Sequence, residues 1–424
     1  MKSDIFEHTT PRGIKGIVIL RPKSNVFYSS ISFHAGSRLV PDYVSKQQTA
    51  HIMEHVAANV LGFSSKGEFD ESFRKNGAYR NASTGSEYMR YTAKCASFEW
   101  QRILGMQIHM LSAPNFNNEI VTVEKSNVRN ELKGHLNDPR WVVDGQCEVA
   151  LGNKDMGLEE QIKTIENVSL DDVVSFHDLA HVTSNMRFVI AGDIDLNEVD
   201  KILDGIRLAS GDSLPTAEIK LRSADPVVIR RDGVPNVTYY LPIVLHKCLS
   251  IKEEYVLAIL CDLLTGSLNS LLYGQVRSRG LAYDIRATYA IERFNSYFIL
   301  RTAAPNDNLV KIARIIADTI NKLRSDGVGQ DVLEKLKARL SGRLMMGFET
   351  AQALSNYVET RYFADDTVVD INDLPSVVRL ITADDISNLV EAFIGRGVWT
   401  LGLFGDTNQG YADRIRDITN EVFH

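Results

Sequence analysis

The two halves of this 424-residue chain repeat the same order of sequence features. An acidic pair opens an expected helix at Asp171-Asp172 and again at Asp384-Asp385. A Gly-Asp pair ends an expected strand at Gly192-Asp193 and again at Gly405-Asp406. Both repeats have the same offset of 213 residues (385 − 172 and 406 − 193). Such a repeat indicates an internal duplication. We therefore expect two related units of about 200 residues each, a usual size for a domain.

Strand-like runs and helical stretches are grouped within each half, and we expect an α+β fold. Strand patterns occupy 17–21 and 26–35, and helical patterns occupy about 100–111 and 118–136. We predict two homologous α/β-roll domains, each a mixed or antiparallel sheet with helices packed on one face. The predicted bounds are 1–208 for the first domain, 209–223 for a linker with Gly, Pro and mixed polar residues, and 224–424 for the second domain.

The composition is typical of a globular protein and disfavours several kinds of partner. Hydrophobic residues make up 44% of the chain and charged residues 24%. A formal net charge of −7 disfavours nucleic acid, because phosphate binding needs a basic face. The longest apolar stretch has about half the length that spans a bilayer, so we expect no membrane partner. Four cysteines without a C-x-x-C pair, and no apolar signal segment, favour a cytoplasmic protein.

The strongest chemical signal is the sequence HIMEH at residues 51–55. Histidines four residues apart lie on one side of a helix, and Glu54 lies beside His51 and His55. Two imidazoles can hold one zinc ion while an adjacent carboxylate takes a proton from water. The pattern H-x-x-E-H is an inverted form of the H-E-x-x-H zinc motif. It predicts a zinc-dependent peptidase.

The same spacing of histidines occurs once more, at His177 and His181. Asp178 is the wrong neighbour for a general base, and no distant carboxylate is expected to join the pair. We therefore predict a structural or surface role for these two histidines.

The duplication predicts that only the first half can hold zinc in this way. Aligning the helix at 331–343 with the helix at 119–131 places Leu336 at Glu124 and Arg343 at Glu131. The helix that corresponds to the histidine-bearing one, EEYVLAILCDLL, contains no histidine.

Several motifs together resemble one known family. HIMEH is followed by Glu131, 76 positions after His55 (131 − 55). This arrangement resembles the pitrilysin-type zinc peptidases, the family of insulin-degrading enzyme and the mitochondrial processing peptidase β subunit. Other segments along most of the chain resemble the same family: AGSRL (35–39), NGAYRNAST (76–84), SNMRFVIAGD (184–193) and RGLAYDI (279–285).

The resemblance implies a role for each residue that matches the motif. His51, His55 and Glu131 would bind one Zn²⁺ per chain, and Glu54 would be the general base. Glu124, seven residues before Glu131, would hydrogen-bond to a ligand histidine and orient it. The alternative for Glu124 is a solvated helix carboxylate.

The resemblance also implies groups that contact the substrate. Asn81, Ala82 and Ser83 would begin an edge strand to which a peptide adds as a further strand. The alternative is an ordinary strand start. Tyr283 and Arg277 in the second domain would donate to a developing oxyanion. Arg279 is a rival to Arg277.

Members of this family enclose a chamber with four such domains, so the resemblance implies that this chain is half of a clamshell. A homodimer is favoured, because the zinc motif and Tyr283 occur in one chain. A heterodimer with a non-catalytic relative is the other arrangement. The implied substrates are peptides or short unfolded segments. The alternative function is that of a non-catalytic structural or peptide-binding member, acting as one subunit of a heterodimer.

Overall fold

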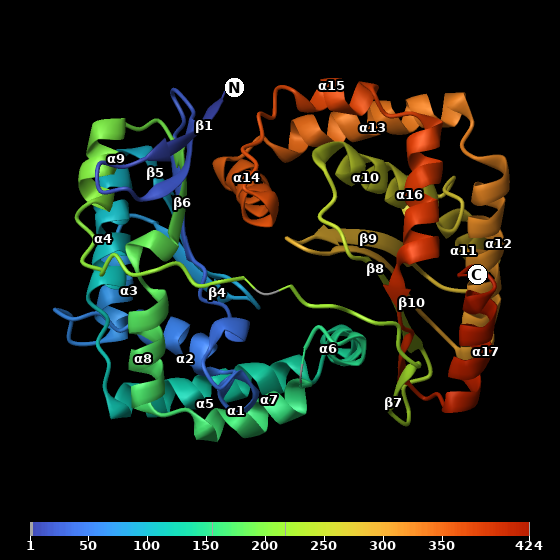
Figure 1. The fold of residues 1–424 in the computed structure, drawn as a ribbon, viewed down its shortest axis with the longest axis horizontal. Coiled ribbons are helices and arrows are strands. Elements are labelled where there is room, and N and C mark those ends of the chain that lie inside the picture. Colours follow the sequence, from blue (N-terminus) through green and yellow to red (C-terminus); the bar gives the residue numbers. More distant parts are fainter. Residues whose placement is uncertain (1–2, 155, 217, 424) are drawn as a thin grey trace.

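The computed structural model of the chain describes residues 3–154, 156–216 and 218–423. Its strands form two sheets, one in each half of the molecule (Figure 1). In the first sheet the strands lie in the order β1-β2-β6-β3-β5-β4. Their bounds are β1 (Asp4–Thr9), β2 (Lys15–Leu20), β3 (Val26–Phe33), β4 (Tyr79–Thr84), β5 (Met89–Ala96) and β6 (Met186–Gly192).

The second sheet has the order β7-β12-β8-β10-β9, with β11 also paired to β8. Its strands are β7 (Val227–Arg230), β8 (Val237–Leu245), β9 (Ile285–Ile291), β10 (Ser296–Ala304), β11 (Val398–Trp399) and β12 (Gly402–Gly405). Apart from β1 and β11, the two sheets have matching strand orders and directions. In each sheet the first matched pair, β2 with β6 and β7 with β12, is parallel, and the other neighbours are antiparallel. The α+β fold and the duplication predicted from the sequence are therefore confirmed.

Apart from α6 and α14, the helices of each half lie on one face of their own sheet, as predicted, and form a large apolar core with it. The helices of the first half are α1 (Tyr43–Lys46), α2 (Thr49–Ala57), α3 (Lys66–Arg74), α4 (Trp100–Ser112), α5 (Asn118–His135), α6 (Pro139–Leu151), α7 (Leu158–Thr164), α8 (Leu170–Ala180) and α9 (Leu196–Leu203). Those of the second half are α10 (Ile251–Thr265), α11 (Tyr273–Ser278), α12 (Asn306–Asp326), α13 (Gln330–Gly347), α14 (Ala351–Asp365), α15 (Leu374–Arg379), α16 (Ala383–Arg396) and α17 (Gln409–Asn420).

The opposite face of each sheet is covered by a helix from the other half. Leu354 and Val358 of α14 pack on Ile17 and Val189 of the first sheet. Reciprocally, α6 packs against β8 and β12 of the second sheet. Both helices lie between the two halves in Figure 1. Because α6 follows α5 as α14 follows α13, the exchange is itself part of the duplication.

Polar contacts fix α14 on the first sheet. Glu359, which is only 1% exposed, accepts hydrogen bonds from Ser30 Oγ at 2.6 Å and Ser32 Oγ at 2.8 Å. Arg90 Nη1 donates to the same carboxylate at 3.1 Å. A buried carboxylate is tolerated only where such donors surround it, so these contacts specify where the helix lies.

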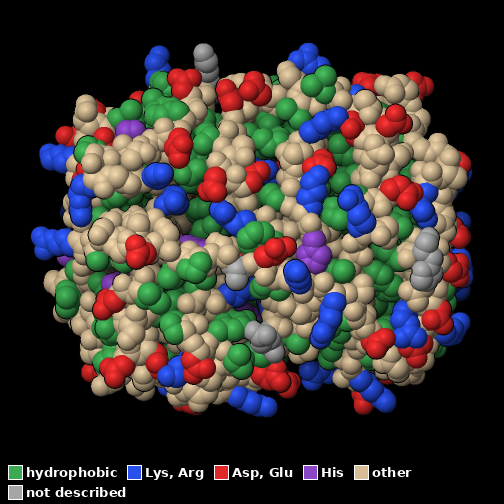
Figure 2. Space-filling view, in the orientation of Figure 1, with side chains coloured by type: hydrophobic (Ala, Val, Ile, Leu, Met, Phe, Trp, Pro, Cys, Tyr) green, Lys and Arg blue, Asp and Glu red, His purple; other side chains and the backbone are tan. Residues whose placement is uncertain are grey.

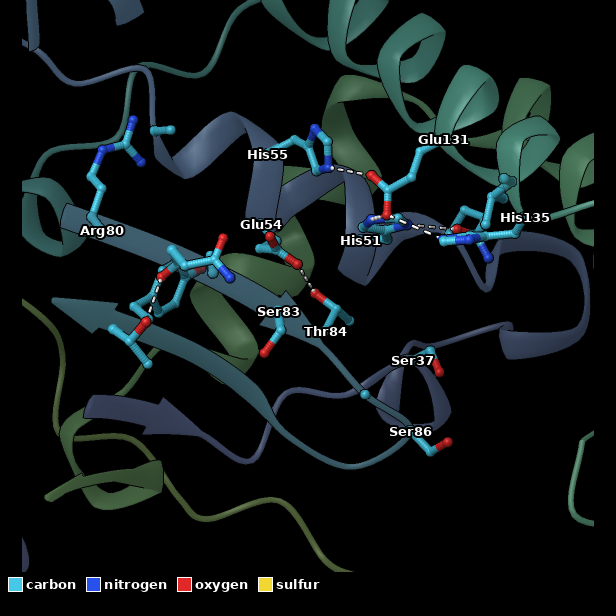
Figure 3. A pocket seen from close by; sticks show the side chains of 18 of the residues that line it. Ser37, His51, Glu54, His55, Arg80, Ser83, Thr84, Ser86, Glu131 and His135 are labelled. Carbon is cyan, nitrogen blue, oxygen red and sulfur yellow. Dashed lines mark hydrogen bonds and ion pairs between the residues drawn. The ribbon is translucent and has the colours of Figure 1, made fainter. Parts of the chain in front are cut away.

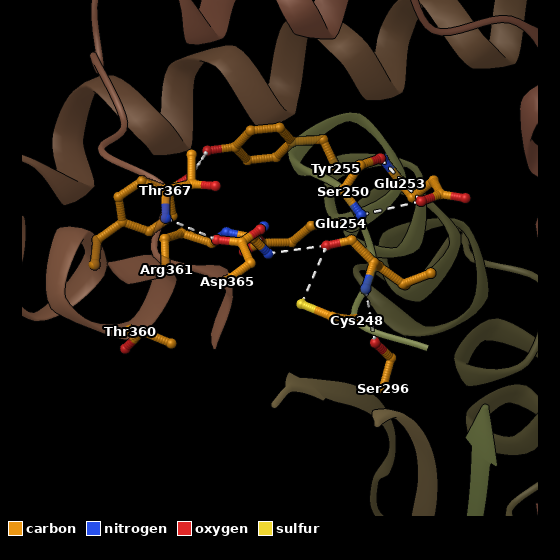
Figure 4. A network of polar contacts seen from close by, with 12 residues as sticks. Cys248, Ser250, Glu253, Glu254, Tyr255, Ser296, Thr360, Arg361, Asp365 and Thr367 are labelled. Atoms are coloured by element: carbon orange, nitrogen blue, oxygen red, sulfur yellow. Dashed lines mark hydrogen bonds and ion pairs between the residues drawn. The ribbon is translucent and has the colours of Figure 1, made fainter. Parts of the chain in front are cut away.

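A second polar network fixes α14 to its own half (Figure 4). Arg361 is buried, donates to Leu249 O at 3.0 Å and to Glu254 Oε2 at 3.3 Å, and pairs with Asp365. Burial raises the pKa of Glu254 to about 7, although the charge of Arg361 acts in the opposite direction. The helix is thus tied to both halves of the molecule.

The described residues between α9 and β7 form neither helix nor strand. The predicted linker, 209–223, lies within this stretch, and its residue 217 lies outside the described part of the chain. The exact domain bounds stay a prediction. Among the described residues, no helix has the length and apolar character needed to cross a membrane. Figure 2 shows acidic and basic side chains interspersed over the face in view.

Candidate metal centre

Helix α2 turns its apolar side chains into the core and its polar ones into a cavity. Ile52 and Met53 are fully buried. His51, Glu54 and His55 line a cavity of about 810 Å³ (Figure 3). The helical period produces this division, because positions 51, 54 and 55 share one side of the helix.

Three potential metal ligands meet in this cavity. One ligand atom from each of His51, His55 and Glu131 lies within 4.8 Å of the other two. His51 Nε2 lies 3.7 Å from Glu131 Oε1, and His55 Nε2 lies 3.5 Å from Glu131 Oε2. Glu131 comes from α5, and Figure 3 shows its carboxylate between the two imidazoles.

The other ring nitrogen of each histidine has a partner elsewhere. His51 Nδ1 lies 3.3 Å from Gln48 Oε1, and His55 Nδ1 lies 3.1 Å from Glu124 Oε2. Acceptors at Nδ1 favour the tautomer in which Nε2 carries a lone pair. Two such nitrogens beside a carboxylate fit a zinc ion, and three protein ligands are the usual number at a hydrolytic site.

Glu124 is buried and belongs to the same network. Its carboxylate accepts hydrogen bonds from Lys66 Nζ at 2.9 Å and Asn127 Nδ2 at 2.9 Å, besides its contact with His55. Burial lowers the pKa of His55, but hydrogen bonds to Glu124 and Glu131 outweigh it and raise that pKa to about 9. The structure thus brings Glu124 to a candidate ligand histidine, and it does not leave the side chain in solvent.

Glu54 faces the cavity beside the ligands without joining them. Thr84 Oγ1 donates to Glu54 Oε2 at 2.6 Å. Burial raises the pKa of Glu54, although the hydrogen bond from Thr84 acts in the opposite direction. A carboxyl group with a raised pKa that faces a cavity is suited to exchanging protons.

The strand β4 forms the end of the first sheet, so among the strands that the structure describes one of its backbone edges has no partner. Its side chains alternate, with Asn81 and Ser83 exposed and Ala82 half-buried. All three line the cavity that contains the candidate ligands. The structure therefore brings together the predicted ligands, Glu54 and the predicted edge strand.

The sequence reasoning missed His135, which also lines this cavity. His135 Nε2 lies 3.6 Å from Glu131 Oε1, and its ring stacks on Trp141 at a centroid distance of 4.1 Å. Its position four residues after Glu131, on the same helix, was the signal that could have found it.

In the second half, ion pairs link the helices that correspond to α2 and α5. Asp262 of α10 pairs with Arg339 at 3.1 Å and with Arg343 at 2.5 Å, both on α13. Within the described residues, His51, His55 and Glu131 are the one group of three or more potential metal ligands. Arg343, which the alignment of the two halves places at the position of Glu131, thus has a structural role in the second half.

The second histidine pair lies in the core of the first domain. His181 is buried, stacks on Phe33 at a centroid distance of 4.2 Å, and lies 3.1 Å from Tyr91 Oη. His177 stacks on His181 at 4.9 Å. These contacts agree with the structural role predicted for the pair.

The structure does not bring Tyr283 and Arg277 to the candidate metal centre. Neither residue lines its cavity. The two contact each other instead, with Arg277 Cζ 4.4 Å from the centroid of the Tyr283 ring. Tyr283 is 79% exposed, so its phenol is open to another molecule. Arg279, the rival residue, donates to Gln275 Oε1 at 3.1 Å.

Two family profiles match successive parts of the chain. The profile described as "Insulinase (Peptidase family M16)" matches residues 18–148, which contain all three candidate ligands and Glu54. The profile described as "Peptidase M16 inactive domain" matches residues 167–340, which contain none of them. The chain belongs to the peptidase M16 family. The resemblance to pitrilysin-type zinc peptidases is thereby confirmed.

The M16 relatives of this chain are named as zinc proteases. The chain is 20% identical to the uncharacterized zinc protease SCO5738 of Streptomyces coelicolor, over 96% of this chain and 91% of that protein. It is 22% identical to the zinc protease PqqE of Helicobacter pylori, over 90% of this chain and 88% of the relative.

Solved structures share the M16 fold along almost the whole chain. A protease from Helicobacter pylori superposes with a TM-score of 0.80 at 19% identity, over 95% of this chain and 100% of that one. A chain of complex III2 from Candida albicans superposes with a TM-score of 0.81 at 12% identity, over 97% and 99% of the two chains. At these identities the likeness concerns the fold alone.

Proposed function

We propose that this M16 member is a zinc-dependent endopeptidase that hydrolyses peptides or short unfolded segments. The observation that carries the proposal is the meeting of two imidazole Nε2 atoms and the Glu131 carboxylate beside Glu54. The names of its relatives as zinc proteases support the same function.

His51, His55 and Glu131 would hold the ion. When bound, zinc acidifies water and polarises a carbonyl group. Glu54 would accept a proton from the attacking water and deliver it to the leaving amine. Thr84 holds the Glu54 carboxylate by its hydrogen bond at 2.6 Å, so the proton moves at a fixed position. Glu124 orients His55 through Nδ1, as carboxylates commonly do for metal-bound histidines.

The free edge of β4 is the proposed seat of the substrate backbone. A peptide that lies beside Asn81, Ala82 and Ser83 would be held by main-chain hydrogen bonds, which depend little on sequence. The same edge ends at Thr84, which contacts Glu54. The peptide would therefore pass directly by the general base.

We also propose that the working enzyme is a homodimer that encloses its substrate. Tyr283 is exposed and does not line the cavity around Glu54 of its own chain. A second copy can supply the missing phenol and guanidinium, as donors to the oxyanion that develops during hydrolysis. The partner chain would thus complete each site.

The second candidate is a non-catalytic subunit of a heterodimer. The fold shared with a chain of complex III2 favours it, because that chain is part of a multisubunit assembly. A structural role, however, needs no buried carboxyl group beside a set of metal ligands. The intact Glu54, His51, His55 and Glu131 therefore favour the peptidase.

The variant Glu54→Gln tests the proposal. The amide keeps the shape of the side chain but cannot accept the proton, so hydrolysis is expected to fall by about 10²–10⁴-fold. Zinc content is expected to stay at one ion per chain. Both are measured on purified protein, by elemental analysis and by cleavage of a mixed peptide library.

The conservative variant Glu68→Gln serves as the control, because Glu68 is an exposed carboxylate on the first turn of α3 that accepts hydrogen bonds from Ser64, just before the helix, and it does not line the cavity. It should cut peptides as wild type does. The proposal would be rejected if the purified wild-type protein contained no zinc and cut no peptide even after incubation with zinc. That result would favour the structural subunit.

A further inference from the structure

One end of the cavity carries two arginines and a single carboxylate. Arg80 on β4 lines the cavity together with Arg74 and Asp70 on α3. Arg80 Nε donates to Asp70 Oδ1 at 3.1 Å, and Arg74 Nε lies 2.8 Å from Asp70 Oδ2. One aspartate thus serves two guanidinium groups. This end of the cavity, formed by Asp70, Arg74 and Arg80, therefore keeps a net positive charge.

Arg80 is held in place and still has donors to offer. Its side chain is only 15% exposed, and its Cζ lies 5.4 Å from the centroid of the Phe69 ring. Among the described residues, its one hydrogen bond uses Nε, so the two terminal nitrogens have no acceptor. Burial lowers the pKa of Arg80, with the charge of Asp70 acting in the opposite direction. A carboxylate that arrived with a ligand would offset this cost and accept from both nitrogens.

The position of Arg80 relates it to the proposed reaction. Arg80, Ala82 and Thr84 alternate along β4 as its half-buried positions, so they share one face of the strand. Thr84 contacts Glu54. Arg80 lies four residues earlier, which is about 13 Å along an extended strand. In Figure 3, Glu54 lies between Arg80 at one side and the pair of His51 and Glu131 at the other.

We propose that the end of the cavity formed by Asp70, Arg74 and Arg80 selects an acidic side chain of the substrate, and that Arg80 recognises it. The inference rests on the proposed peptidase function and on the seat of the peptide beside β4. A peptide strand there presents every second side chain to the face that carries Arg80. The acidic residue is therefore separated from the cleaved bond by about four residues of extended chain, and a lysine at that position is disfavoured.

A matched peptide series tests the inference. Peptides that carry Glu, Gln or Lys at each of the positions around the cleaved bond are compared by kcat/KM with zinc-loaded wild type. At one position, the kcat/KM of the Glu peptide is expected to exceed that of the Gln peptide by about ten-fold, because a hydrogen bond to a charged group stabilises a complex by about this factor. Arg80→Gln should abolish this preference. Asp70→Asn should increase it, because the competing carboxylate is removed.

The control is Lys94→Gln on the neighbouring strand β5. Lys94 contacts Gln352 and does not line the cavity, so this variant should keep the preference of wild type. Zinc content and the thermal midpoint show whether each variant is folded. Equal cleavage of the Glu, Gln and Lys peptides by wild type, or an unchanged preference in Arg80→Gln, would overturn the inference while the peptidase stands.

Binding distinguishes the remaining outcome. If wild type cuts none of the peptides, the proposed peptidase function is rejected, but the selection of an acidic side chain is still open. Fluorescence anisotropy with the same labelled peptides and zinc-loaded protein then still measures the selection. Tighter binding of the Glu peptide than of the Lys peptide, lost in Arg80→Gln, would support the acidic preference of the cavity. Equal binding would reject it.

Discussion

At the scale of single residues, the two candidate ligand histidines divide their ring nitrogens between two tasks. Nδ1 of each ring contacts an acceptor, Gln48 or Glu124, and Nε2 points toward Glu131. This division fixes the rotation of each imidazole before any ion arrives. Such preorganisation reduces the cost of assembling a metal site.

Glu124→Gln is expected to weaken zinc binding without abolishing it. The amide removes the negative charge that holds His55 Nδ1, while His51, His55 and Glu131 remain. Affinity should fall by about 10–100-fold, the usual effect of losing the partner of a ligand histidine. Competition with a fluorescent chelator measures the change. Glu119→Gln, a change near the start of the same helix, is the control, and equal affinity in both variants would contradict the role given to Glu124.

The residues that could be predicted from the sequence are those with a local signature. HIMEH needs only one helical turn, and Glu131 follows from the family spacing. His135 lay within reach of the same reasoning. Arg80 and Asp70 did not, because their contact depends on how β4 packs beside α3. Tyr283 marks another limit, since the resemblance supplied a role but no position relative to the cavity of the same chain.

At the scale of elements, α14 combines packing with buried charge. Its apolar side covers the first sheet, and Arg361 on the same helix contacts Glu254 of α10. Amphipathic periodicity can predict that such a helix buries one face. It does not specify which sheet receives that face, so the exchange of α6 and α14 could not be read from the sequence.

Glu254 is expected to make stability depend on pH. Its pKa is about 7 in the folded protein against 4.5 as the ordinary value, so the folded state binds the proton more tightly. Stability therefore falls as pH rises from about 4.5 to about 7, by about 3 kcal/mol for this group. In urea denaturation, the free energy of unfolding of Glu254→Gln, taken relative to that of wild type, should be higher at pH 8 than at pH 5.

The neighbouring Glu253 provides the control for this pH effect. Although burial acts against it, hydrogen bonds from Lys247 and Ser250 lower the pKa of Glu253 below its ordinary value, so the group stays charged from pH 5 to pH 8. Glu253→Gln should shift stability equally at both values. If Glu254→Gln and wild type lost stability in parallel over this range, the proton would not reside on Glu254.

At the scale of the whole molecule, the groups expected to act together lie apart within one chain. The ligands and Glu54 share a cavity, whereas Tyr283 is exposed beside Arg277 in the second half. Two copies that face each other can combine the two sets of groups. The proposed closed pair would admit unfolded segments and exclude folded proteins.

Mixing two inactive variants tests this arrangement. Glu54→Gln lacks the base, and Tyr283→Phe is expected to lose about 10²-fold in kcat. If Tyr283 acts on the site of its partner, a mixed dimer contains one site with both groups intact. Random exchange of subunits should then recover about a quarter of wild-type activity. Analytical ultracentrifugation gives the mass, and a strict monomer, or no recovery after exchange, would contradict the shared site.

The reciprocal position of α6 and α14 also has a consequence for how the chain can be divided. A break within 209–223 would give one fragment whose sheet lacks α14 and another whose sheet lacks α6. Each fragment would then expose an apolar face that only the other can cover. Coexpressed fragments should therefore assemble as an obligate pair, and either one alone should aggregate. The molecule is, in this sense, a split protein whose two parts happen to be joined.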